Sequence, residues 1–223
     1  MKNLDALKIK ITLICKEIVG NTSLVYSYLG FSIPQEHDPT IEDTMNKFET
    51  IEGKEVLLVL IDTAGEEDYQ NMLDKWIEEG DSFMLIFAIN DKESFRALNS
   101  KVQRIRKHTG KSPSLLIVGN KKDLENQREV TYEEAESFAK KIGAEYIETC
   151  ALNNNDMNVT NAFKTLATIT FHKMPEMFKD LSSFEDFSGI IKKKTHSYHY
   201  YLTHMFRYIQ LQFSLQNFPL LHK

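Results

Sequence analysis

Two residues suited to ligand binding follow the apolar run 56–61 of the chain. Asp62 comes directly after the run, and Gly65 stands three residues further on. A short apolar run predicts a strand covered on both faces, and open α/β sheets bind their ligands at the carboxyl edge of such strands. A carboxylate then lies at that edge, and Gly65 lets a backbone N–H approach a phosphate without a Cβ in the way. Taken alone, the same pattern also describes the start of an ordinary loop.

A second polar cluster, Asn120-Lys121-Lys122-Asp123, follows the apolar run 115–119. It has the form N-K-x-D and resembles the guanine-recognition motif of small GTPases. The chemistry agrees, because an aspartate can accept hydrogen bonds from the N1–H and the exocyclic amine of guanine, a donor pair that adenine lacks. The Asn120 amide can reach the base edge, and the Lys121 stem can cover the purine face. As a lone tetrapeptide, the motif fits a loop turn equally well.

The apolar periodicity predicts the strands and helices that must position these residues. Residues 7–15 alternate at period two and predict a strand, and residues 44–51 and 55–61 flank a turn and predict a β-hairpin. Further strands are expected at 83–89, 115–119 and 145–149, and helices at 24–29 (with Asn21, Thr22 and Ser23 as candidate caps), 69–79, 94–108, 131–142 (opened by a capping box) and 159–169. Strands alternating with helices favour an α/β fold with a mostly parallel sheet, to which the hairpin adds one antiparallel edge strand.

Composition limits the class of protein. The 223 residues are enough for one domain and an extension, and the net charge of −5 argues against a general nucleic-acid binder. The two cysteines, Cys15 and Cys150, do not make a disulfide framework, which favours a reducing compartment. No apolar run reaches the length of a bilayer span. We therefore expect a cytoplasmic protein.

Further motifs extend the resemblance. Residues 38–43 (Asp-Pro-Thr-Ile-Glu-Asp) read like the effector loop, or switch I, of the Ras subfamily, and residues 62–66 then read as its switch II. Phe87–Asn90 and Glu148–Ala151 follow in the family's order and spacing. Over residues 7–172 the chain is similar to a whole Ras-like G domain. The resemblance implies the P-loop NTPase type of α/β fold, with a mostly parallel six-stranded sheet and helices on both faces.

The resemblance also implies a molecular switch in signal transduction that binds GTP or GDP with Mg²⁺. The positions expected to contact the nucleotide are Gly20, Asn21, Thr22, Thr40, Asp62, Gly65, Asn120, Lys121, Asp123, Cys150 and Ala151. Those expected to hold the metal are Thr22, Thr40 and Asp62. Gly65 and Glu66 occupy the catalytic positions. Effector and regulator proteins would bind residues 36–43 and 65–75, because loss of the γ-phosphate releases both loops.

The phosphate loop departs from the pattern G-x-x-x-x-G-K-[ST], to which residues 15–22 correspond. Cys15 replaces the first glycine, and Ile18 is β-branched where a permissive backbone is needed. Asn21 replaces the lysine that neutralises the phosphates, and Glu17 adds a negative charge. Losing one lysine and adding one glutamate removes roughly 3–6 kcal/mol, or about two to four orders of magnitude in affinity. We therefore expect weakened nucleotide binding.

Other positions leave alternatives open. Glu66 stands where most Ras proteins have the glutamine that orients the attacking water, and a carboxylate cannot donate to the transition-state oxygens. Hydrolysis is then slow or altered, or Glu66 is a solvated residue of a protein that does not hydrolyse GTP. Lys16 either swings toward the phosphates or is a solvated loop lysine. Cys150 replaces a serine and Leu152 a lysine, which weakens base stacking, and Cys150 is expected to be a small buried thiol.

The C-terminal extension, residues 173–223, lies outside the resemblance. It is basic and rich in aromatic residues and histidine, and we expect it to be poorly ordered. It has no C-terminal Cys-a-a-X box, so a prenyl anchor is not expected, and Lys192–Lys194 support at most a weak peripheral contact with the inner membrane surface. A mis-assigned terminal exon is the alternative origin of this segment.

Two hypotheses about function remain at this point. The first is a monomeric Ras-like small GTPase whose nucleotide binding is weakened. The second is a pseudo-GTPase of the same fold that binds partners through a static switch surface. Excess guanine nucleotide separates them, because a ligand that binds the folded state raises its melting temperature.

Overall fold

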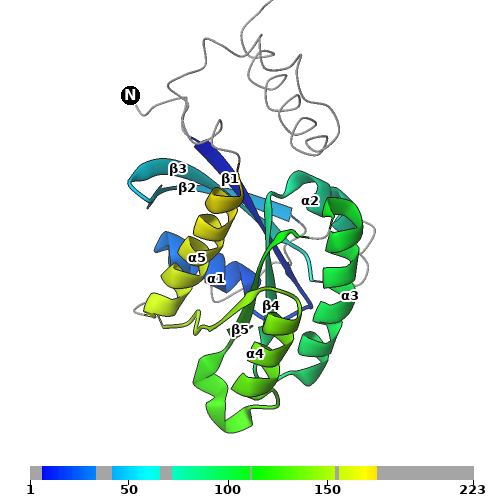
Figure 1. Cartoon of the computed structure of the whole chain (residues 1–223). Coiled ribbons are helices and arrows are strands. Elements are labelled where there is room, and N and C mark those ends of the chain that lie inside the picture. Colours follow the sequence, from blue (N-terminus) through cyan, green and yellow to red (C-terminus); the bar gives the residue numbers. More distant parts are fainter. Residues whose placement is uncertain (1–6, 34–41, 66–71, 111, 154–155, 175–223) are drawn as a thin grey trace, which may run out of the picture. The chain divides into compact units, whose positions relative to one another are not determined.

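The computed structural model describes residues 7–33, 42–65, 72–110, 112–153 and 156–174. These residues contain one six-stranded sheet in the order β2-β3-β1-β4-β5-β6 (Figure 1). The strands are β1 (Leu7–Cys15), β2 (Glu42–Ile51), β3 (Lys54–Thr63), β4 (Ser82–Ala88), β5 (Ser114–Asn120) and β6 (Glu145–Glu148). Only the edge strand β2 is antiparallel to its neighbour among these paired strands. The predicted fold class is confirmed.

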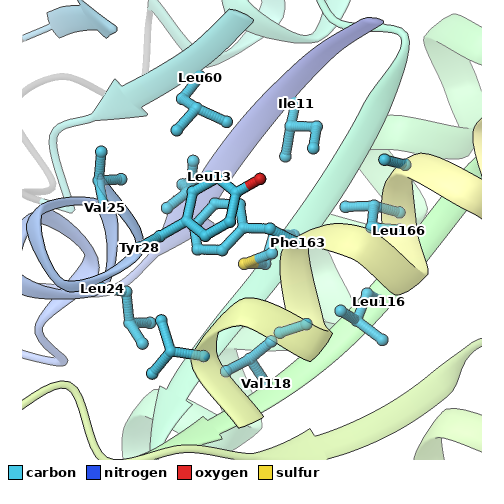
Figure 2. Close-up of a cluster of buried hydrophobic side chains, with 14 of the residues drawn as sticks. Ile11, Leu13, Leu24, Val25, Tyr28, Leu60, Leu116, Val118, Phe163 and Leu166 are labelled. Carbon is cyan, nitrogen blue, oxygen red and sulfur yellow. The ribbon is translucent and has the colours of Figure 1, made fainter. Parts of the chain in front are cut away.

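Helices cover both faces of the sheet (Figure 1). They are α1 (Asn21–Leu29), α2 (Leu73–Glu79), α3 (Lys92–Thr109), α4 (Tyr132–Lys141) and α5 (Met157–Lys173), with a 3₁₀ helix η2 (Lys122–Gln127). One buried cluster joins α1 and α5 to the sheet, and a second joins α2, α3 and α4 to the opposite face. In the first cluster the rings of Tyr28 and Phe163 stack with their centroids 4.2 Å apart (Figure 2).

Strand β1 divides its side chains between these two clusters. Ile11, Leu13 and Cys15 enter the cluster under α1 and α5, whereas Ile14 enters the other. This alternation follows from the period of two in a strand, and burial on both faces follows from the helices that cover both. Packing on both faces therefore fixes the position of the carboxyl end of β1, where the phosphate loop begins.

Several local expectations are corrected. Helix α1 begins at Asn21 rather than at residue 24, and its N-cap is Gly20, with no side-chain cap. The predicted capping role of Asn21, Thr22 and Ser23 is therefore wrong, because these residues form the first helical turn. The helix η2 was not predicted from the sequence. By contrast, the capping residue of α4 is confirmed: the Thr131 hydroxyl accepts a hydrogen bond from the Glu134 N–H at 3.1 Å.

Some predictions fall outside the described residues. These are the positions Thr40 and Glu66, most of the effector segment 36–43, and the extension beyond Met174. Helix α2 confirms the C-terminal part of the helix expected at 69–79. Among the described residues, none of the helices combines the length and apolar character required to cross a bilayer.

Candidate nucleotide-binding site

The carboxyl edge of the sheet gathers the predicted site. Strands β1 and β3 are paired there, with Leu13 opposite Asp62, and β5 and β6 are paired with Gly119 opposite Glu148. Because parallel strands end at the same edge, the segments that follow β1, β3, β5 and β6 emerge together. The phosphate loop and the two segments expected to read the base are among them.

The backbone of the phosphate loop keeps a left-handed conformation despite its altered side chains. Ile18 has a φ of 61°, and Gly20 has a φ of 88° and a ψ of 34°. A Cβ on Gly20 would lie 2.8 Å from Asn120 Nδ2, so the space there also requires glycine. Left-handed residues turn successive N–H groups into a concave anion site, and a helix N-terminus adds its partial positive charge. This backbone geometry agrees with the predicted phosphate loop, whose binding of phosphate stays a prediction.

Asn21 makes a contact that the sequence did not predict. Its Nδ2 atom donates hydrogen bonds to Asp62 Oδ1 at 2.6 Å and to the Thr63 carbonyl at 2.9 Å. The Asp62 side chain is fully buried. Where the family pattern has a lysine for the phosphates, this chain has an amide that holds the end of β3.

The residues that would hold a metal fit Mg²⁺ by their chemistry. Asp62 offers a carboxylate and Thr22 a hydroxyl, and both residues are buried at the carboxyl edge of the sheet. Within the described segments, no group of three or more His, Cys, Asp or Glu side chains could hold a metal by itself. Mg²⁺ usually takes one or two protein oxygens and completes its shell with phosphates and water. The Asp62 carboxylate and the Thr22 hydroxyl are oxygen ligands of this kind.

Gly65 lies directly against the phosphate loop. A Cβ at this position would come within 2.5 Å of the Lys16 carbonyl carbon and 2.6 Å of the Glu17 nitrogen. Nearby, the Thr63 hydroxyl donates a hydrogen bond to the Leu13 carbonyl at 2.7 Å. The end of β3 is thus held against both β1 and the loop that follows it.

Asn120 connects the phosphate loop to the segments expected to read the base. Its Nδ2 atom donates to the Val19 carbonyl at 2.8 Å, and its Oδ1 atom accepts from the Thr149 hydroxyl at 3.1 Å and the Ala151 N–H at 3.3 Å. The side chain is 2% exposed. It therefore acts as a positioning residue for three segments. Direct contacts of Asn120 and Ala151 with the base remain predictions.

Asp123, the proposed reader of guanine, is held by Cys150. The Cys150 thiol donates a hydrogen bond to Asp123 Oδ1 at 3.1 Å. Cys150 is partly exposed, so the expectation of a small buried thiol is wrong. Partial burial and this carboxylate raise the pKa of the Cys150 thiol, which keeps it protonated as a donor. Lys121, between Asn120 and η2, has a left-handed φ of 64°.

An ion pair that the sequence did not predict joins the segments expected to read the base. Arg128 donates to the two carboxylate oxygens of Glu148 at 2.8 and 3.0 Å, and the Tyr146 hydroxyl donates to the same carboxylate at 2.8 Å. Hydrogen bonds to Glu125 and Glu148 raise the pKa of Arg128 above its ordinary value. Glu148 belongs to a motif that we noted, but the spacing between Arg128 and Glu148 carries no periodic signal.

Comparison with known proteins agrees with this geometry. The family model described as the Ras family matches residues 10–172. The chain belongs to the Ras family. It is 40% identical over 149 residues to Protein ras-1 of Neurospora crassa, covering 66% of this chain and 69% of that protein. It is 37% identical over 150 residues to Ras-like protein 1 of Saccharomyces cerevisiae, covering 66% and 48% of the two chains.

The Ral proteins are also similar. Ras-related protein Ral-B of Rattus norvegicus is 34% identical over 161 residues, which cover 71% of this chain and 77% of that protein. This Ras-family chain is therefore a Ras-like small GTPase of the signalling-switch class, and the family as a whole binds GTP or GDP with Mg²⁺.

Replacing Ile18 with asparagine should stabilise this Ras-family protein. Ile18 has a left-handed φ of 61° and is 84% exposed, so its side chain contributes strain and little burial. Relief of this strain is worth about 1 kcal/mol, or roughly 2–4 °C in melting temperature, because asparagine tolerates the left-handed region. Urea unfolding measures the change. The control Leu152→Asn alters an exposed side chain without a positive φ and should stay within about 0.5 kcal/mol of the wild type. An unchanged or lower stability of Ile18→Asn contradicts the strain argument.

The buried thiol of Cys15 should make stability fall at alkaline pH. Burial, followed by the charge of Asp62, raises the pKa of Cys15 from 9.0 to about 12, against an opposing effect of Lys101. Above pH 9 the unfolded chain loses this proton while the folded protein keeps it. The contribution of Cys15 to the free energy of unfolding is therefore fully present below pH 9 and is lost as the pH rises toward 12. The expected loss between pH 8 and 10 is about 1.4 kcal/mol. Urea unfolding of the wild type and Cys15→Ala at both pH values isolates this contribution. Equal pH slopes for the two proteins would exclude it.

Proposed function

We propose that this Ras-family protein binds GTP and GDP with Mg²⁺, with lower affinity than a chain that has the phosphate-loop lysine. One observation carries the proposal. The phosphate loop keeps its left-handed residues, Ile18 and Gly20, at the start of α1, while Asn120 holds the loop to the segments that read the base. Backbone N–H groups and the helix N-terminus supply phosphate binding that does not depend on a lysine.

The proposed roles follow from the chemistry of each side chain. Thr22, Thr40 and Asp62 hold Mg²⁺, which would neutralise part of the phosphate charge. Asp123 accepts from guanine, and Cys150 orients its carboxylate. Gly65 lies against the phosphate loop, and we propose that its N–H contacts the γ-phosphate. These assignments predict selectivity for guanine over adenine, because the Asp123 acceptor is left unpaired by adenine.

Hydrolysis is a separate question from binding. Glu66 stands at the position that orients water, and its carboxylate can accept from water but repels the phosphoryl oxygens. We propose that bound GTP is hydrolysed slowly, so that the GTP state is long-lived whenever it forms.

The partner surface that we propose comprises residues 36–43 and 65–75. A contact between its two halves supports it: the Lys75 ammonium lies 3.2 Å from the Glu42 carboxylate. The indole N–H of Trp76, the residue after the second half, donates to the same carboxylate at 2.8 Å. The start of β2 and helix α2 are therefore joined, and a partner bound to one would be affected by movement of the other.

We also propose that the protein is a monomer in the cytoplasm. Its G domain is residues 7–172, and residues 173–223 are an extension, in which Lys192–Lys194 make at most weak peripheral membrane contact.

A second candidate function is an interaction module with a static switch surface. The hydrogen bonds from Asn21 to Asp62 and Thr63 favour it, because they hold the start of switch II through a protein group. A guanine nucleotide would then have little effect on the surface that partners see.

Melting temperatures test the proposal. GDP or GTP at about 1 mM with Mg²⁺ should raise the melting temperature of the wild type by several degrees, and ADP or ATP should not. The variant Asp123→Ala should lose most of the guanine-specific rise. Equal curves with and without guanine nucleotide would support the static module instead.

A further inference from the structure

A single amide atom joins helix α1 to the end of strand β3. Asn21 Nδ2 donates to Asp62 Oδ1 at 2.6 Å and to the Thr63 carbonyl at 2.9 Å. Asp62 is fully buried, and a hydrogen bond to a buried carboxylate is stronger than one between neutral, solvated groups. Asn21 and Asp62 lie 41 residues apart in the sequence, so the contact links two distant segments.

Two other contacts hold the phosphate loop, which joins β1 to α1. Gly65 lies against the peptide between Lys16 and Glu17, and Asn120 donates to the Val19 carbonyl at 2.8 Å. The loop between β1 and α1 is therefore held at its beginning, its middle and its end by groups of the protein. Of these contacts, only the one at its end uses the residue that replaces the family's lysine.

We propose that Asn21 is a positioning residue that fixes Asp62 and the end of β3 against α1 independently of nucleotide and metal. This proposal rests on the proposed function only in taking a guanine nucleotide as the ligand of the site. A lysine carries its charge on a long stem toward the phosphates, whereas the shorter asparagine spends its donor on Asp62 and Thr63. The chain thereby exchanges part of its affinity for phosphate for a fixed contact within the protein.

The test uses the full chain freed of nucleotide and treated with a chelator of divalent cations. We expect Asn21→Ala to lower its melting temperature by about 4–8 °C, from the loss of a hydrogen bond to a charged group. Alanine is a better helix former than asparagine, so a role limited to the first turn of α1 predicts no loss or a small gain. The control Asn99→Ala makes the same chemical change on the exposed surface of α3 and should not lower the melting temperature.

Two more measurements separate a specific contact from general damage. In a double-mutant cycle, Asn21→Ala should have a much smaller effect in the Asp62→Ala background than in the wild type. Amide exchange in residues 62–65 should speed up in Asn21→Ala while exchange in β4 and β5 stays slow. If Asn21→Ala does not fold, Asn21→Ser retains a donor and should fold with a smaller loss.

Additive effects in the cycle, or a nucleotide-free Asn21→Ala that melts within 1 °C of the wild type, overturn the proposal. These results are distinguishable from failure of the proposed function. A wild type that GDP stabilises, with an Asn21→Ala that melts normally, removes only the positioning role. A wild type that ignores GDP, with an Asn21→Ala that melts early, removes only nucleotide binding.

Discussion

The double variant Glu17→Gln with Asn21→Lys should bind GDP with Mg²⁺ about two to four orders of magnitude more tightly than the wild type. The change removes one negative charge and adds one positive charge beside a polyanion. Together these are worth roughly 3–6 kcal/mol. The geometry needed is present, because Asn21 opens α1 directly after Gly20, whose φ of 88° gives the loop its left-handed turn.

Calorimetric titration of nucleotide-free protein measures this gain. The variant Asn99→Lys with Glu133→Gln makes the same change in net charge on exposed helical positions and serves as the control. It should change the affinity by less than about threefold near 0.15 M salt, where the screening length is about 8 Å. An equal gain in both double variants would point to net charge rather than to the phosphate loop. No gain in either would mean that the loop backbone does not bind phosphate.

The substitution Gly65→Ala should both destabilise the protein and weaken nucleotide binding. Its Cβ would lie 2.5–2.6 Å from backbone atoms of Lys16 and Glu17, and backbone cannot yield as the tip of a flexible side chain can. Overpacking of this kind costs about 1–3 kcal/mol. Relief of the clash moves the end of β3 away from the phosphate loop, so we expect affinity for GDP to fall by about tenfold or more.

A comparison with Gly110→Ala separates crowding from backbone strain. Gly110 has a φ of 90° and open space around its Cβ position, so its substitution carries strain alone. Its φ of 90° and ψ of −165° are nearly restricted to glycine, so the substitution should lower stability by about 1–3 kcal/mol and leave nucleotide affinity unchanged. A Gly65→Ala protein with wild-type stability and affinity would show that the contact with Lys16 and Glu17 is not close in solution.

The sequence predicted the sheet well because each parallel strand is buried on both faces. The apolar runs that became β4 and β5 are buried throughout, and such runs have few other interpretations. The start of α1 was misplaced because Asn21, Thr22 and Ser23 are good capping residues, yet the left-handed Gly20 turns the chain into the helix before them.

The contacts that organise the site were harder to predict. The Asn21–Asp62 and Arg128–Glu148 pairs join side chains from different elements, and local periodicity carries no information about which distant side chains meet. The motif 120–123 does follow a buried strand, as expected, and its reading of the base stays a prediction. Asn120 makes its hydrogen bonds within the protein because it is buried between three loops, and this burial was not evident from the sequence.

The central claim is that the altered phosphate loop still supports guanine-specific binding. Titration of nucleotide-free wild-type protein with GDP and with ADP, each with excess Mg²⁺, tests it most directly by calorimetry. We predict saturable binding of one GDP per chain, weaker than in the Glu17→Gln, Asn21→Lys variant, and no binding of ADP. Equal heats for the two nucleotides, or none for either at millimolar concentration, would contradict the claim.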